Sequence, residues 1–210
     1  MEILPAHHND TIDAAAGCLL AGGVVVIPTD TVYGLAALPT HADAVQTMYV
    51  AKGRPERMHL PVLGASLTQV RQLGIEMNGQ SSALADQWWP GPLTMVFGFA
   101  PGAIRPPWLA GRDEVAVRIP HHAFLLALMR VTGVLLVTSA NRHGATTPAA
   151  AGEVPGVLAS EVSLVVDGGL LDGDPSTLVN VRDGTISVER EGAVSRGDIA
   201  ATLGRAGGAP

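Results

Sequence analysis

The sequence of 210 residues is poor in cysteine and in lysine, and each shortage excludes a class of protein. Cys18 is the one cysteine, so neither a disulfide framework nor a thiolate metal cluster can form within the chain. Lys52 is the one lysine; the other basic residues are arginines, and the formal net charge is -6. This acidic balance argues against broad, sequence-independent adhesion to nucleic acid, although a local basic cleft is compatible with it.

Long hydrophobic runs and the common phosphate-binding and catalytic loops are absent as well. No apolar run is long enough to span a bilayer, and the first residues lack the pattern of a secretory signal, so we expect a cytoplasmic protein with no membrane partner. The chain has no GxxxxGK[ST], HExxH or GxSxG sequence, and no GxGxxG after a strand. The histidine pairs at residues 7–8 and 121–122 are interpreted as surface or capping residues rather than metal ligands.

The residues that are present predict one compact α/β domain. A hydrophobic content of 47% is enough for a core, and we assign residues 1–203 to a single domain and residues 204–210 to a flexible tail. Apolar periodicity predicts helices near 10–20 (with Asp10 as the cap), 42–51, 66–73, 81–88, 124–129 and from 195. Strands are predicted at 24–27, 60–63, 93–99, 114–119, 134–137, 164–167, 176–181 and 186–190. Lone strands mixed with a hairpin indicate a twisted mixed sheet flanked by helices.

Polar side chains follow several of the buried elements at the point where each element ends. Residues 28–35, PTDTVYGL, come directly after the β-branched strand at 24–27. Ligands of open α/β sheets bind at such strand ends. The polar residues in these positions are Thr31, Lys52, Arg54, Arg118, Ser139, Asn141, Ser176 and Arg190. Several cations at one cleft suit a substrate with many negative charges, such as a triphosphate, and the hydroxyls and amide would orient it.

Six short sequences occur in the order seen in one known family. They are PTDTVYGL (28–35), KGRP (52–55), WPGPLT (89–94), VAVR (115–118), SAN (139–141) and PST (175–177). In these motifs the chain resembles the YrdC-like threonylcarbamoyl-AMP synthases, in their single-domain form. The resemblance implies a large concave basic pocket, and formation of threonylcarbamoyl-adenylate and pyrophosphate from L-threonine, bicarbonate or CO2, and ATP. The product would serve N6-threonylcarbamoyladenosine synthesis at position 37 of tRNA.

The resemblance also implies site residues and partners. Lys52 and Arg54 would be catalytic and would contact the nucleotide together with Met58, Asn141, Thr147 and Arg190. The threonine would be held by Thr31, Arg118, Ser139 and Ser176, with Arg118 as the carboxylate clamp. No metal ligand is assigned, and Mg2+ is expected to come with ATP. Downstream threonylcarbamoyl-transfer proteins, and tRNA or double-stranded RNA, are the expected macromolecular partners.

The chain departs from the family pattern at several positions, and two other functions stay open. His59 stands where relatives usually have proline, and Leu63 where they often have a histidine that contacts the substrate. These changes permit a divergent substrate. One alternative is a carbamoyl-adenylate-forming domain, as in carbamoyltransferases and hydrogenase maturation factors. The other is a module that binds double-stranded RNA or tRNA, against which the acidic balance and the lack of aromatic residues beside the arginines both weigh.

Overall fold

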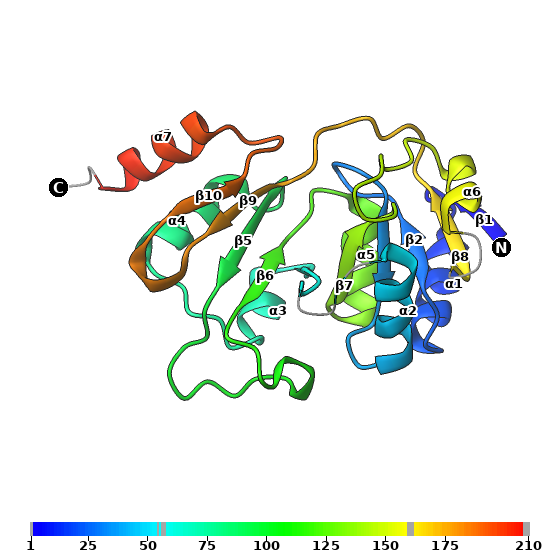
Figure 1. Cartoon of the computed structure of the whole chain (residues 1–210), viewed down its shortest axis with the longest axis horizontal. Helices are drawn as coiled ribbons and strands as arrows, with labels where there is room; N and C mark the ends of the chain where they lie inside the picture. Colours follow the sequence, from blue (N-terminus) through cyan, green and yellow to red (C-terminus); the bar gives the residue numbers. More distant parts are fainter. Residues whose placement is uncertain (1, 54, 56–57, 159–161, 208–210) are drawn as a thin grey trace.

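The computed structural model describes residues 2–53, 55, 58–158 and 162–207, which fold around one ten-stranded sheet (Figure 1). The strands are β1 (Glu2–Pro5), β2 (Val25–Ile27), β3 (Gly34–Ala37), β4 (Val62–Leu63), β5 (Leu93–Phe97), β6 (Val115–Arg118), β7 (Leu135–Ser139), β8 (Leu164–Asp167), β9 (Thr177–Asn180) and β10 (Ser187–Arg190). Their order is β1-β8-β2-β3-β7-β4-β6-β5-β9-β10. Both parallel and antiparallel pairs occur along it, which confirms the predicted mixed sheet.

Helices cover the sheet, and strand β2 is buried on both faces. Val25 and Ile27 belong to the core formed with α1 (Asn9–Leu20) and α5 (Ala123–Thr132). Val26, on the opposite side of the strand, belongs to the core formed with α2 (Ala42–Lys52). Successive side chains of a strand point to opposite faces, so the β-branched run places hydrophobic groups in both cores at once. The two groups of helices therefore lie on opposite faces of the sheet (Figure 1).

The remaining helices are short or lie at the other end of the molecule. They are α3 (Leu67–Arg71), α4 (Gly79–Trp88), α6 (Pro155–Leu158) and α7 (Arg196–Gly207). Helix α7 packs beside α4, where the indole N–H of Trp88 donates to Thr202 Oγ1 over 3.2 Å (Figure 1). Helix α7 continues to Gly207, so helical structure extends into the segment expected to be a tail. Within the described part of the chain, no helix is both long and apolar enough to cross a bilayer.

Three local features differ from the sequence-based expectation. Helix α1 has His8 at its N-cap position, without a capping bond from that side chain, and Asp10, the expected cap, lies in its first turn. Strand β1 was not predicted; it pairs only with β8 at the edge of the sheet, where Pro5 is tolerated because no strand pairs with its other side. Strand β3, with the sequence GLAA, also has no strand-like composition. It forms because β2 and β7 pair with it on both sides. Glycine is needed at its first position, since a Cβ at Gly34 would lie 2.6 Å from the Val137 side chain.

The predicted hairpin near the C-terminus is present. Strands β9 and β10 pair antiparallel, and the connection contains a short 3-10 turn over Arg182–Gly184 with Asp183 at a φ of 55°. Asp183 and Gly184 both adopt the left-handed conformation that this sequence favours. The register of the pairing shifts between Val188 and Arg190, so the irregularity lies directly before the last residue of β10.

Candidate active site

The strand pairings bring the predicted polar strand ends to one edge of the sheet. The facing residues are Gly34 with Ser139, Leu63 with Arg118, and Leu93 with Thr177. Each of these residues begins or ends its strand. The loops that leave the strands at these points therefore converge on the same region, as expected for a ligand site of an open α/β sheet.

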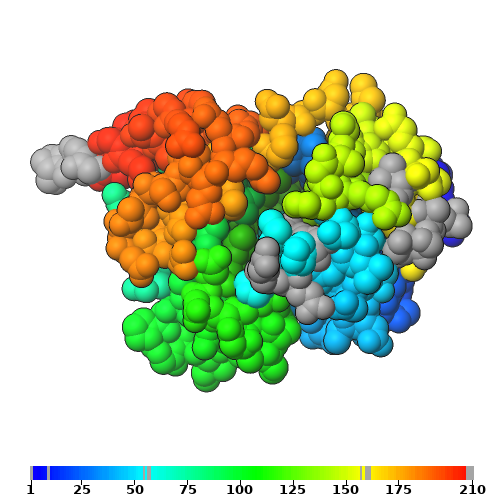
Figure 2. Space-filling view, in the orientation of Figure 1, coloured from blue at the N-terminus to red at the C-terminus, as the bar shows by residue number. Residues whose placement is uncertain are grey.

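A pocket of about 610 Å³ lies at this edge. Figure 2 shows the surface hollowed between the orange hairpin segment and the cyan and yellow-green segments across from it. Eight of the ten predicted site residues line the pocket: Thr31, Met58, Arg118, Ser139, Asn141, Thr147, Ser176 and Arg190. The other two are Lys52, which is buried beneath the lining, and Arg54, which falls outside the described residues.

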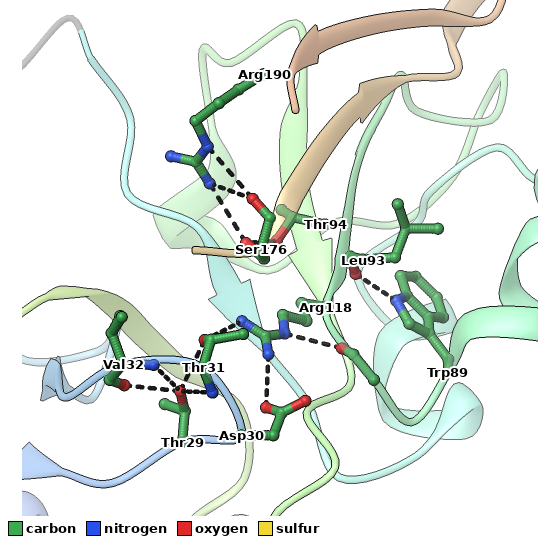
Figure 3. Close-up of polar contacts among 11 residues, drawn as sticks. Thr29, Asp30, Thr31, Val32, Trp89, Leu93, Thr94, Arg118, Ser176 and Arg190 are labelled. Atoms are coloured by element: carbon green, nitrogen blue, oxygen red, sulfur yellow. Dashed lines mark hydrogen bonds and ion pairs between the residues drawn. The ribbon is translucent and has the colours of Figure 1, made fainter. Parts of the chain in front are cut away.

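The loop after β2 is held in shape by Thr29. Its hydroxyl donates to the carbonyl of Val32 over 2.7 Å and accepts the backbone N–H of Thr31 over 3.1 Å. The two threonine hydroxyl oxygens are 3.0 Å apart, and both side chains are buried (Figure 3). A short hydroxyl side chain that bonds its own loop in this way fixes a tight turn without regular secondary structure. Thr29 thus shapes the loop, and Thr31 is presented to the pocket.

Arg118 is the most completely bonded cation among the pocket residues whose contacts are described. From the last residue of β6, its Nε donates to the carbonyl of Gly91 over 2.9 Å and its Nη1 to Thr31 Oγ1 over 3.1 Å. Its Nη2 forms an ion pair of 2.5 Å with Asp30 Oδ1 (Figure 3). Burial lowers the pKa of Arg118, and the Asp30 carboxylate acts in the opposite direction. An arginine starts from so high a value that it stays protonated, so the pocket contains a fixed positive charge.

The face of β6 that carries Arg118 follows the predicted alternation. Val115 and Val117 are buried in the core, whereas Glu114, Ala116 and Arg118 line the pocket. The period of two residues in the sequence is sufficient to place these side chains, because each side chain of a strand points to the face opposite its neighbours.

Lys52 lies under the other side of the pocket. It is the last residue of α2 and is only 3% exposed, which confirms that it faces inward. Its ammonium donates to the carbonyl of Ser139 over 2.7 Å, to Ser139 Oγ over 3.0 Å and to Asn141 Oδ1 over 2.8 Å. The Asn141 amide donates onward to the carbonyls of Arg142 and Ala145. Lys52 therefore fixes the loop after β7 and adds its charge beneath two pocket residues.

The third group of polar residues lies at the start of β9. Ser176 Oγ is 2.8 Å from Thr94 Oγ1, and Arg190 donates to the carbonyl of Ser176 over 2.8 Å and to its hydroxyl over 3.3 Å (Figure 3). Thr94 lines the pocket, but sequence reasoning did not select it. The sequence does contain a pattern that indicates it: Thr94 is the one polar residue of the strand LTMVF, and its neighbours Leu93 and Met95 are buried.

The described lining contains acidic groups as well as arginines. Glu114 and Glu189 line the pocket beside Arg118 and Arg190. Glu114 pairs with Arg182 at 2.5 Å, and Glu189 accepts from the Asn180 amide at 2.8 Å. The cations are thus grouped near Thr31 and Ser176, whereas the carboxylates are turned toward the hairpin. His59 and Leu63, the two departures from the family pattern, both line the pocket.

A pocket at strand ends, lined by hydroxyls, an amide and arginines, defines a small-molecule-binding protein of the α/β class. A family model for Sua5, YciO and YrdC proteins, described as "Telomere recombination", matches residues 18–192. The chain belongs to this family.

Relatives and solved structures agree with the assignment. A threonylcarbamoyl-AMP synthase of Bacillus subtilis is 36% identical over 199 residues, covering 94% of this chain and 58% of that protein. A putative threonylcarbamoyl-AMP synthase of Mycobacterium tuberculosis is 34% identical over 203 residues and is covered to 92%, with 95% of this chain. The structure of Pyrococcus abyssi Sua5 complexed with L-threonine superposes with a TM-score of 0.86 at 31% identity, over 97% of this chain and 60% of that one. The chain thus spans less than two thirds of the B. subtilis and P. abyssi proteins.

Proposed function

We propose that this protein is a threonylcarbamoyl-AMP synthase, which forms threonylcarbamoyl-adenylate and pyrophosphate from L-threonine, bicarbonate or CO2, and ATP. The observation that carries the proposal is the convergence of three polar groups on one pocket: Thr31 with Arg118, Ser139 with Asn141, and Ser176 with Arg190. The names of the B. subtilis and P. abyssi relatives and the L-threonine complex of P. abyssi Sua5 support it.

The amino-acid end of the substrate belongs beside Arg118. The guanidinium is anchored by Asp30 outside the pocket lining and by Thr31 within it. An arginine held in this way is preorganised for a carboxylate, because its planar N–H groups match the two oxygens and little side-chain entropy remains to be lost. The hydroxyls of Thr31, Ser139 and Ser176 would then orient the amine and the side-chain hydroxyl of threonine.

The nucleotide end belongs on the side of Asn141, Thr147 and Arg190. Arg190 is exposed at the end of β10 and faces the pocket, where it can follow a flexible phosphate chain. Met58 would contact the nucleotide from the opposite loop. Arg54 is proposed for the same role from its place in the KGRP motif alone. Lys52 would act through Ser139 and Asn141, since its three described bonds go to these two residues.

Mg2+ is proposed to enter with ATP. Within the described part of the chain, no three His, Cys, Asp or Glu side chains are grouped so that they could hold a metal ion. The two carboxylates of the lining are already engaged with Arg182 and Asn180. The metal would therefore be held chiefly by the phosphate oxygens and would supply charge neutralisation there.

The chemistry needs positioning more than a protein nucleophile. The threonine amine attacks the carbon of CO2 and loses a proton, which gives a carbamate. A carbamate oxygen then attacks the α-phosphorus of ATP in line, and the bond from that phosphorus to the β-phosphate oxygen breaks as pyrophosphate leaves. All reactants are anionic at this stage, so Arg118, Arg190 and the charge of Lys52 would offset their repulsion and hold them in line.

A reactive adenylate implies an acceptor downstream. The product would pass to threonylcarbamoyl-transfer proteins that modify position 37 of tRNA, and a cytoplasmic location goes with that role. The net charge of -6 argues against broad adhesion of tRNA to this chain, so we propose that those proteins supply most of the tRNA contacts.

The test is product formation by the purified full chain with Mg2+, ATP, bicarbonate and each of several amino acids. We expect release of pyrophosphate that requires both threonine and bicarbonate, and a threonylcarbamoyl-adenylate peak by mass spectrometry. Valine and serine serve as matched controls: valine has a methyl group in place of the threonine hydroxyl, and serine lacks the threonine methyl group. Carbamoyl phosphate in place of threonine and bicarbonate tests the carbamoyl-adenylate alternative. Folded protein that forms no adenylate with threonine would refute the proposal.

A further inference from the structure

Thr94 is a buried polar residue of the pocket to which the proposed reaction gives no part. It belongs to β5, whose residues are all buried, and it is only 4% exposed. Its hydroxyl oxygen lies 2.8 Å from Oγ of Ser176, and within the described part of the chain this is the hydrogen bond that its side chain forms (Figure 3). Burial of a hydroxyl is unfavourable unless the group is hydrogen-bonded. The contact with Ser176 therefore stabilises a threonine at this position of the strand.

The backbone around Ser176 is fixed from three sides. Strands β5 and β9 pair parallel in a register that sets Thr94 opposite Leu178, two residues after Ser176. Gly192 packs against the same backbone, because a Cβ at Gly192 would lie 2.9 Å from the carbonyl carbon of Ser176. Arg190 donates to the Ser176 carbonyl over 2.8 Å. With the main chain held in this way, the rotation of the Ser176 hydroxyl is what remains to be set, and Thr94 lies within hydrogen-bond distance of it.

The bonding capacity of a serine hydroxyl limits what Ser176 can offer a substrate. The oxygen accepts at two sites and donates one proton. Nη2 of Arg190 donates to Ser176 Oγ over 3.3 Å and so occupies one of the two acceptor sites, since a guanidinium can only donate. If Thr94 donates to the second site, the interaction left to Ser176 is the donation of its own proton. Ser176 lines the pocket, so that proton is directed at a bound molecule.

We propose that Thr94 is a positioning residue, whose hydroxyl donates to Ser176 Oγ and so leaves the Ser176 proton for an oxygen of the bound amino acid. The opposite direction, from Ser176 to Thr94, would turn a lone pair of Ser176 toward the pocket. That lone pair would repel the anionic oxygens that the arginines of the pocket attract. This assignment rests on the proposed function for the identity of the substrate, and it makes Ser176 a donor to a threonine oxygen rather than an acceptor for the amine. A partner of this kind acts on the substrate through the residue that it orients.

The first experiment is a double-mutant cycle measured by steady-state kinetics. Thr94→Val keeps the shape of the side chain and removes the hydroxyl, so we expect KM for threonine to rise about tenfold, as for the loss of one oriented hydrogen bond. We expect kcat to stay within about threefold. KM for ATP should stay within about twofold, since Arg190 is also bonded to the Ser176 carbonyl. Ser176→Ala should raise KM for threonine at least as much, and the double variant should be no worse than Ser176→Ala alone.

Two further variants separate positioning from a general effect on the fold. Thr94→Ser keeps the hydroxyl and should recover most of the affinity for threonine. Thr202→Val removes a buried hydroxyl of α7 that bonds Trp88 and the carbonyl of Asp198, and it should leave both KM values as in the parent protein. Losses that add in the double variant, or a Thr94→Ser variant as weak as Thr94→Val, would overturn the proposal.

The second experiment is independent of activity. Neutron diffraction from crystals of the parent protein in D2O locates the deuterium of each ordered hydroxyl. We expect the Thr94 deuterium between the two oxygens and the Ser176 deuterium pointing into the pocket. A Ser176 deuterium that points at Thr94 would refute the inference and leave the proposed function unaffected. If the expected arrangement is found in a protein that forms no adenylate with threonine, the proposed function fails and the orientation of Ser176 by Thr94 stands.

Discussion

Two arginines in one pocket are held in opposite ways. Arg118 is 5% exposed, belongs to a strand inside the sheet, and is bonded to three different partners. Arg190 is exposed, ends the outermost strand after a register shift, and donates to Ser176. The first arginine has its direction fixed before any substrate arrives, whereas the second can adjust.

The difference matches the two kinds of substrate that the pocket is proposed to bind. A small amino acid offers one carboxylate at a fixed distance from its amine, so a rigid clamp costs the least entropy on binding. A triphosphate is long and flexible, and it must change its charge distribution as pyrophosphate leaves. An exposed arginine on an edge strand can follow that change. In this proposal the rigid arginine, Arg118, binds the amino acid, and the adjustable one, Arg190, binds the triphosphate in the same cavity.

Replacement of Arg118 should give the largest effect. In Arg118→Met we expect kcat/KM for threonine to fall about a thousandfold, because the carboxylate loses its charged donors. Stability should fall by about 3–5 kcal/mol, since Asp30 is left as a largely buried charge without its cation. The measurements are steady-state kinetics and urea unfolding.

The double variant Asp30→Asn, Arg118→Met is the matched control. It removes both charges, so most of the stability should return while activity stays lost. If the double variant is as unstable as Arg118→Met, the broken ion pair is not the reason for the loss of stability. The claim that Asp30 holds Arg118 in a fixed direction then fails.

Lys52 tests whether a cation can act without lining the pocket. Lys52→Met removes three described hydrogen bonds to Ser139 and Asn141, so we expect a loss of stability of about 3 kcal/mol and a fall in kcat of about a hundredfold. Because Lys52 carries the one side-chain amine, peptide mapping after treatment with an amine-reactive reagent gives an independent measure of its burial, apart from any reaction at the α-amino group. Rapid modification of Lys52 in the native protein would contradict the buried position.

Arg190 should show the adjustable behaviour most clearly. Arg190→Ala is expected to raise KM for ATP about tenfold and to leave KM for threonine within about twofold. Stability should change by about 0.5 kcal/mol or less, since the side chain is exposed. Arg196→Ala, on an exposed arginine of α7 paired with Glu191, is the control for loss of a surface charge. A large loss of stability in Arg190→Ala would show that Arg190 supports the fold as Arg118 does.

The sequence was sufficient to place the residues that periodicity controls. The alternation in β6 assigned Arg118 to the pocket face, and the helical stripe of α2 assigned Lys52 to the interior. What periodicity could not supply were relations across the sheet. Strand β3 depends on two neighbours rather than on its own composition, and the Asp30 pairing of Arg118 joins a loop to a strand 88 residues away. Thr94 was missed for the same reason, because its partner Ser176 lies 82 residues away in the sequence.

The smallest expected effect is a change of stability with pH, which comes from the partly buried side chain of His122. Burial lowers the pKa of His122 below its unfolded value of about 6.5. Above pH 6.5 the ring is neutral in both states, so the group does not affect stability there. As the pH falls below 6.5, the unfolded chain takes up the proton first, so the folded state loses stability until its own His122 is protonated. Urea unfolding between pH 7 and pH 5 should therefore show a steeper decline in the parent protein than in His122→Gln. Equal slopes would mean that burial does not keep the His122 ring neutral in the folded protein.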